Sequence, residues 1–121
     1  MKNNYIEEQI QILLNNFKAK NFDYIITKSS QYIKKFPEHT ILYNLLGSSY
    51  QSIGQHKEAK NIFNEGLKYE PKNLALKNNL ATSYKNLLQY DFAENIYNDV
   101  IKLNPQYVNA YVNLGNLKRD I

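Results

Sequence analysis

The positions of apolar residues predict pairs of α-helices. One run with the spacing i, i+3, i+4 and i+7, which places residues on a single helix face, comprises Tyr43, Leu46, Gly47 and Tyr50. A second run of the same kind comprises Ala59, Ile62, Phe63, Gly66 and Leu67. Gly54 stands between the two runs, where a glycine is suited to ending a helix. The pattern therefore predicts a hairpin of two helices.

Extended along the chain, this pattern predicts about seven helices and no strand. The expected helices span residues 5–19, 23–35, 40–53, 57–69, 74–87, 91–103 and 108–120. The fold class is therefore all-α.

The hairpins recur with a fixed period. Pro37, Pro71 and Pro105 lie 34 residues apart, and other residues keep the same interval, among them Leu46, Leu80 and Leu114. A period of this length is typical of a solenoid, in which each unit stacks on its neighbours to bury its apolar face. We expect one domain over residues 1–121.

The repeated unit resembles the tetratricopeptide repeat (TPR). Residues 40–73 carry Tyr43-x2-Leu46-Gly47-x2-Tyr50, then Ala59-x3-Phe63, then Pro71. Residues 74–107 keep most of these positions but have Lys77 in place of the first aromatic residue. Residues 6–39 form a degenerate unit, with Ile25 and Ser29 at the small and aromatic positions, and residues 108–121 supply only a first helix. The resemblance implies a right-handed α-solenoid of antiparallel helix hairpins, with three repeats and one further C-terminal helix.

The composition favours a folded protein that acts without disulfides, membrane insertion or nucleic acid. Of 121 residues, 43% are hydrophobic and 21% charged, and there is no cysteine. No apolar stretch is long enough for a membrane span, so we expect a cytoplasmic protein. The formal net charge is +4, but Arg119 is the only arginine, which argues against recognition of phosphates and bases.

Catalytic chemistry finds no candidate residues. His39 and His56 are the only histidines, and neither has a partner spaced to share a metal or relay a proton. We expect no enzymatic activity, no metal and no cofactor. The resemblance instead implies a scaffold for protein–protein interaction.

In this family, the first helix of each hairpin lines a concave groove that binds peptides. Carried over by position, the candidates are Asn44, Ser48, Gln51, Asn78, Asn79, Thr82, Lys85, Asn109, Asn113 and Asn116. An amide side chain can donate to and accept from a peptide backbone, so an extended protein segment is the expected ligand. Asn79 and Asn113 are the strongest candidates because they share the sixth position of the repeat. The alternative is that they are solvated residues in an asparagine-rich chain.

Some TPR domains hold the C-terminal carboxylate of chaperones with a clamp of two lysines, one arginine and two asparagines. The corresponding positions here are Ile10, Leu14, Leu45, Ala75 and Asn79, or, one repeat later, Asn44, Ser48, Asn79, Asn109 and Asn113. Neither set contains a cation. We therefore expect no chaperone binding of this kind.

The last helix suggests two other functions. The sequence reaches Ile121 before a second helix of the fourth unit, so Tyr111, Leu114 and Leu117 are expected to lie uncovered. They could mediate self-association, for example as a homodimer. Alternatively, the chain is the TPR arm of a larger multidomain protein, such as one resembling glycosyltransferases.

Overall fold

The computed structural model describes residues 2–120, and the side chains of residues 4–119. The described chain folds into α-helices without strands. These are α1 (Lys2–Lys18), α2 (Phe22–Lys35), α3 (Thr40–Ser52), α4 (His56–Tyr69), α5 (Leu74–Asn86), α6 (Tyr90–Leu103) and α7 (Val108–Asp120). The prediction of seven helices is confirmed, and every boundary lies within three residues of the expected one.

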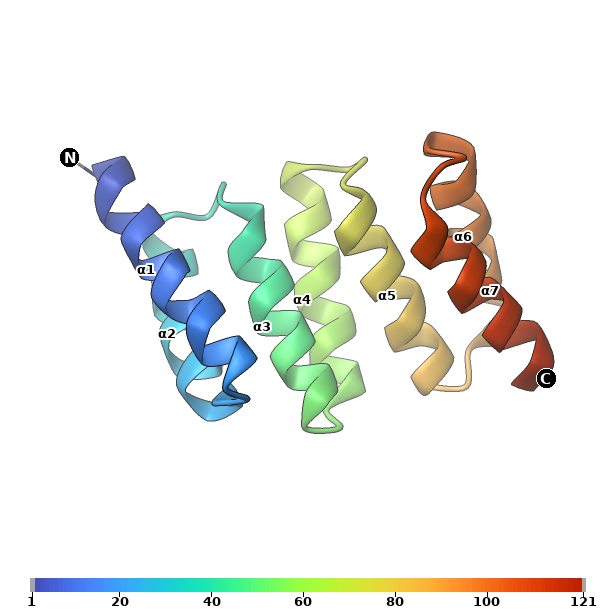
Figure 1. Cartoon of the computed structure of the whole chain (residues 1–121), viewed down its shortest axis with the longest axis horizontal. Helices are drawn as coiled ribbons and strands as arrows, with labels where there is room; N and C mark the ends of the chain where they lie inside the picture. Colours follow the sequence, from blue (N-terminus) through green and yellow to red (C-terminus); the bar gives the residue numbers. More distant parts are fainter. Residues whose placement is uncertain (1, 121) are drawn as a thin grey trace.

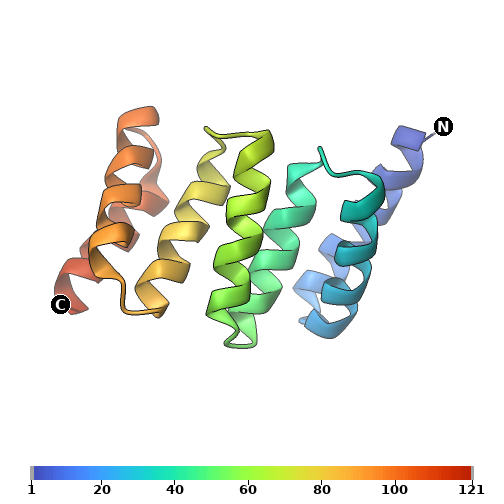
Figure 2. The same cartoon turned by 180° about the vertical axis from the view of Figure 1, so that it is seen from behind.

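The helices form two layers in an elongated row. Helices α1, α3, α5 and α7 lie in front in Figure 1, and α2, α4 and α6 lie in front when the molecule is seen from behind in Figure 2. Each helix packs on the next in sequence, and α1 also contacts α3, α3 contacts α5, and α5 contacts α7. We call the surface formed by α1, α3, α5 and α7 the odd-helix face.

The turn within each hairpin uses one residue in the left-handed region. Lys20, Gly54 and Leu88, which are 34 residues apart, have φ angles of 61°, 82° and 64°. The role predicted for Gly54 is confirmed. Lysine and leucine adopt this conformation only at a cost in free energy, because their Cβ atoms approach the following carbonyl group.

Close helix packing within the second hairpin depends on a glycine. A Cβ atom on Gly47 would lie 2.3 Å from Cε1 of Phe63, whose side chain is fully buried. Tyr43 is buried on the same helix, and its hydroxyl donates to the Pro37 carbonyl at 2.8 Å. In the third hairpin, Lys77 takes the place of Tyr43 and pairs instead with Asp99 at 2.6 Å.

The degenerate first hairpin exchanges large and small residues. Ser29 stands where the second hairpin has Phe63, and Leu13 stands where it has Gly47. Both Leu13 and Ser29 are buried, so the leucine occupies core volume that the aromatic ring supplies in the next unit. The Ser29 hydroxyl has no hydrogen-bond partner there.

The expectation that Leu114 and Leu117 lie uncovered is wrong. Leu117 is fully buried in a cluster with Ala81, Ala93 and Tyr97, and Leu114 packs partly buried against that cluster. The reason is that these two residues point from α7 toward the preceding hairpin. Of the predicted group, Tyr111 alone is largely exposed, at 48%.

Candidate functional site

Side-chain amides join neighbouring helices of the odd-helix face. Asn79 Nδ2 donates to Asn44 Oδ1 at 2.5 Å, linking α5 to α3. Asn113 Nδ2 donates to Asn78 Oδ1 at 3.2 Å, linking α7 to α5. The second pair is the first one displaced by one 34-residue repeat. An amide has two donor hydrogens and two acceptor lone pairs, so each pair uses only part of its capacity.

Gln51 adds a further link between α3 and α5. Its Nε2 donates to the Asn79 carbonyl at 2.9 Å and to Ser83 Oγ at 2.8 Å. Both donor hydrogens are therefore engaged, and only the side-chain oxygen remains for another molecule.

The structure divides the predicted candidates into internal and accessible residues. Asn78 is only 7% exposed, and the Thr82 hydroxyl bonds to the Asn78 carbonyl and, at 2.7 Å, to the Tyr97 hydroxyl. These two side chains serve mainly to hold α5 in place. Thr82 is half-buried but engaged in these hydrogen bonds. The other candidates that are half-buried or exposed are Asn44, Ser48, Gln51, Asn79, Lys85, Asn109, Asn113 and Asn116.

Burial also affects a tyrosine beneath this face. The pKa of Tyr97 is raised by burial, and the hydrogen bond with Thr82 opposes that rise only in part. The phenol is therefore neutral at ordinary pH and can either donate to Thr82 or accept from it.

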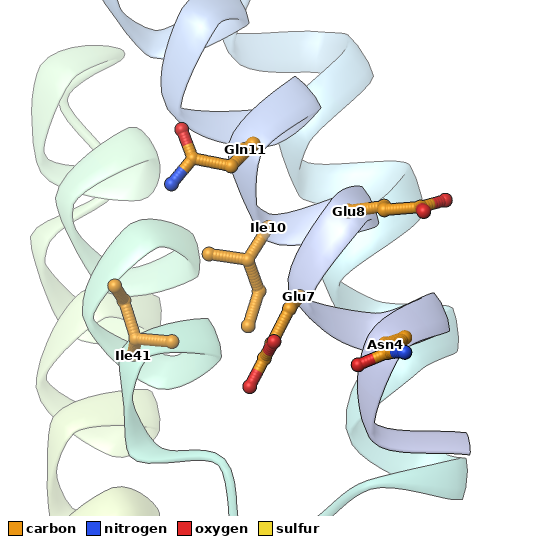
Figure 3. Close-up of a pocket in the computed structure, with 6 residues that line it drawn as sticks. All are labelled: Asn4, Glu7, Glu8, Ile10, Gln11 and Ile41. Atoms are coloured by element: carbon orange, nitrogen blue, oxygen red, sulfur yellow. The ribbon is translucent and has the colours of Figure 1, made fainter. Parts of the chain in front are cut away.

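A pocket lies on the odd-helix face between α1 and α3. It has a volume of about 560 Å³ and is lined by Asn4, Glu7, Glu8, Ile10, Gln11 and Ile41 (Figure 3). From the sequence, only Ile10 among these residues was compared with a carboxylate clamp, and no site was predicted here. The available signal was that isoleucines stand at this end of the repeat array at positions where the later repeats have asparagine or alanine.

Neither a metal centre nor a membrane-crossing segment is found among the residues that the structure describes. Among the described side chains, no three of the types His, Cys, Asp and Glu lie close enough together to hold a metal ion. None of the helices in the described part of the chain is both long enough and apolar enough to cross a bilayer.

The sequence matches a model of the family described as tetratricopeptide repeat over residues 50–115, which is more than half of the chain. The chain belongs to the tetratricopeptide repeat family. No curated protein matches the sequence.

Solved TPR structures share the fold. PcrH, in complex with the chaperone binding region of PopD, has a TM-score of 0.87 at 16% identity, over 99% of this chain and 96% of that chain. The first TPR of Spaghetti (RPAP3), bound to the HSP90 peptide SRMEEVD, has a TM-score of 0.85 at 16% identity, over 91% and 87%. The second TPR domain of human RPAP3, in complex with the HSP70 peptide SGPTIEEVD, has a TM-score of 0.84 at 17% identity, over 89% and 90%. These similarities show a solenoid of helical repeats.

The positions compared above with a carboxylate clamp hold apolar or uncharged polar side chains. Ile10, Leu45 and Leu14 are buried or half-buried apolar residues at the first two repeats. Asn44 and Asn79 bond to each other. The charged residues that line the pocket at the first repeat are carboxylates, Glu7 and Glu8.

Proposed function

We propose that this TPR chain binds an extended segment of another protein along the odd-helix face, without catalysing a reaction on it. The observation that carries the proposal is the repeated amide pair, Asn44 with Asn79 and Asn78 with Asn113. The pairs place partly unused donors and acceptors at one-repeat intervals along the face. An extended peptide needs such groups because its backbone N–H and C=O groups lose water on binding.

The structural neighbours support the same general role. PcrH is in complex with a segment of PopD, and the two RPAP3 domains are bound to peptides. A chain with this fold is therefore able to present a surface to an extended ligand. For the present chain we propose a ligand other than a C-terminal acidic peptide, since its clamp positions hold no cation.

Selection of peptides tests the proposal directly. A phage library of random dodecapeptides is selected on the immobilised chain, and an enriched peptide is labelled for fluorescence anisotropy. Ser48→Arg places a long cation on α3 at the centre of the odd-helix face, and Asn61→Arg makes the same kind of change on exposed α4 in the other layer. We expect Ser48→Arg to weaken binding about tenfold or more and Asn61→Arg to leave it unchanged. Equal binding by both variants would contradict the proposal.

A second candidate function is self-association through α7. Val108, Tyr111 and Val112 are 68%, 48% and 54% exposed and lie at positions i, i+3 and i+4 of the helix. Burying such a patch against a second copy would remove apolar surface from water. We expect light scattering across a concentration series to show a dimer that Tyr111→Lys dissociates. A monomer at every concentration would reject this function.

A further inference from the structure

The pocket between α1 and α3 differs chemically from the rest of the odd-helix face. The position that holds Asn44 and Asn78 in the second and third repeats holds Ile10 in the first. The position that holds Ala75 and Asn109 in the later repeats holds Ile41 in the second. At this end of the face, isoleucines therefore stand at positions where the later repeats have asparagine or alanine.

These two isoleucines form the apolar part of the pocket. Ile10 is 8% exposed and belongs to a core cluster with Leu13 and Leu42, so its position is rigidly supported. Ile41 is 40% exposed, and its side chain faces Ile10 across the pocket (Figure 3). An aliphatic side chain inserted between them would cover surface that is now exposed to water.

A carboxylate lies beside this apolar surface. Glu7 is exposed on α1 one turn before Ile10 and Gln11, and Figure 3 shows its side chain on the same side of α1 as the two isoleucines. Within the described part of the chain, no cationic side chain forms a salt bridge with Glu7. The Glu8 side chain points away from Ile41 and lies at the outer rim.

The volume fits a ligand side chain together with part of its backbone. At about 560 Å³, the pocket lies within the range of about 300–1,000 Å³ that is typical of ligand sites. Gln11 lies at the upper edge in Figure 3 and offers an amide, as Asn79 and Asn113 do at the same position of later repeats. The second repeat has the buried Leu45 at this position, so a peptide backbone that passes from Asn79 to Gln11 crosses one repeat without an amide at this position before it enters the pocket.

We propose that the pocket is a specificity site for a large aliphatic residue that adjoins a lysine or arginine in the bound peptide. The aliphatic side chain packs between Ile10 and Ile41, and the cation pairs with Glu7. This inference rests on the proposed function, because it assumes that a peptide binds along the odd-helix face. The proposed site therefore prefers a cation beside the aliphatic residue, whereas a peptide such as SGPTIEEVD has a glutamate there.

The test uses the peptides selected on the full chain and two matched pairs of variants. Ile41→Ala introduces the residue that the third repeat has at this position, Ala75. Its control is Ile53→Ala, because Ile53 lies at a hairpin turn and is 41% exposed, close to the 40% of Ile41. Glu7→Gln removes the carboxylate, and its control is Glu65→Gln on exposed α4. Affinities are measured by anisotropy at low and high salt.

We expect the selected peptides to be enriched in an aliphatic residue next to lysine or arginine. Ile41→Ala should weaken the binding of such a peptide about tenfold, because an anchored aliphatic side chain loses its contact surface. Glu7→Gln should weaken it about two- to fivefold, an effect that high salt abolishes, because the ion pair is exposed. Neither control should change the affinity.

The outcomes separate this inference from the proposed function. Binding that Ser48→Arg removes, but that Ile41→Ala and Glu7→Gln leave unchanged, would overturn the specificity site and keep the peptide-binding face. Preferential binding of SGPTIEEVD, whose isoleucine adjoins a glutamate and which has no cationic side chain, would overturn the specificity site as well. Binding that none of the three variants weakens, or the absence of any selected peptide, would overturn both.

Discussion

Replacing Gly47 by alanine should lower the free energy of unfolding of the second hairpin. Two contributions oppose each other, a steric clash with Phe63 and a gain in helix propensity. The new Cβ atom would lie 2.3, 2.6 and 2.8 Å from three ring carbons of Phe63. The ring is fully buried, so it has no free space into which to turn. Either the ring or the backbone of α3 must shift.

The cost of that shift competes with a gain in helix propensity. Overpacking a core by a methyl group costs about 1–3 kcal/mol, while replacing glycine by alanine within a helix gains about 1 kcal/mol. The net loss for Gly47→Ala is therefore roughly 0–2 kcal/mol. Gly115 occupies the same repeat position in α7, and a Cβ atom there meets no atom within 4 Å. Gly115→Ala should accordingly stabilise the chain by up to about 1 kcal/mol.

Urea unfolding followed by circular dichroism measures both variants. The free energies are comparable only where the m value stays constant, because a repeat array can unfold in parts. The difference between Gly47→Ala and Gly115→Ala isolates the clash, about 1–3 kcal/mol. Equal stability changes in the two variants would refute the reasoning. In a Phe63→Leu background, which lacks the ring atoms that the methyl group meets, Gly47→Ala should cost less than it does in the original chain.

Three further predictions concern buried and strained groups. Ser49 Oγ is buried without a hydrogen-bond partner, so Ser49→Ala should raise the unfolding free energy by about 1 kcal/mol in the same urea experiment. Ser83→Ala removes one of the two acceptors of the Gln51 amide and should lower the unfolding free energy by a similar amount. Leu88 has a positive φ, which glycine adopts without strain, but glycine also gains more conformational entropy than leucine in the unfolded chain. The relief of strain is the larger effect, so Leu88→Gly should stabilise the chain by about 0.5–1 kcal/mol in thermal unfolding. Burial raises the pKa of Tyr43 from 10.0 to about 12. As the pH rises, Tyr43 therefore ionises in the unfolded chain before it does in the folded chain, and the free energy of unfolding should fall between pH 10 and pH 12. Tyr43→Phe should make that fall shallower in a pH series of unfolding measurements.

The helices and their stacking could be predicted from sequence because their signals are local and repeated. Apolar spacing indicated each helix, and the 34-residue interval indicated which residues take equivalent places. The exchange between Leu13 and Ser29 was not predicted, since it depends on two positions in different helices that compensate each other in volume. A sequence pattern that considers one position at a time scores Leu13 and Ser29 as two separate mismatches to the repeat and does not show that they compensate each other.

The burial of Leu117 illustrates a second reason for error. The sequence pattern shows that Leu114 and Leu117 share a helix face, but it does not show that the preceding hairpin covers this face. The structure places Leu117 against Ala81 and Tyr97, so α7 already has a partner on that side. The open sides of Tyr111 and Gly115 correspond to the side of α3 on which α4 packs in the second hairpin.

The candidate site was predicted only in part because a residue type does not reveal how its hydrogen bonds are used. Asn78 and Asn79 are adjacent and identical, yet Asn78 is buried as an acceptor for α7 while Asn79 is half-buried and donates to α3. Their difference arises from the 3.6-residue turn, which directs neighbouring side chains to different helices. Position in the repeat therefore predicted the face correctly, but not which amides remain accessible.

The order of chemistry along the odd-helix face gives a ligand a preferred direction. Glu7 and the isoleucines lie at the first two helices of the face, the amide pairs join α3 to α7, and Arg119 is exposed near the end of α7. A peptide with its cation toward α1 satisfies Glu7, and reversing it would bring that cation toward Arg119. Backbone contacts to amides alone would accept either direction, since an amide both donates and accepts. The non-repeating residues at the two ends therefore determine the orientation, and the repeating residues between them provide contacts that do not depend on the ligand's sequence.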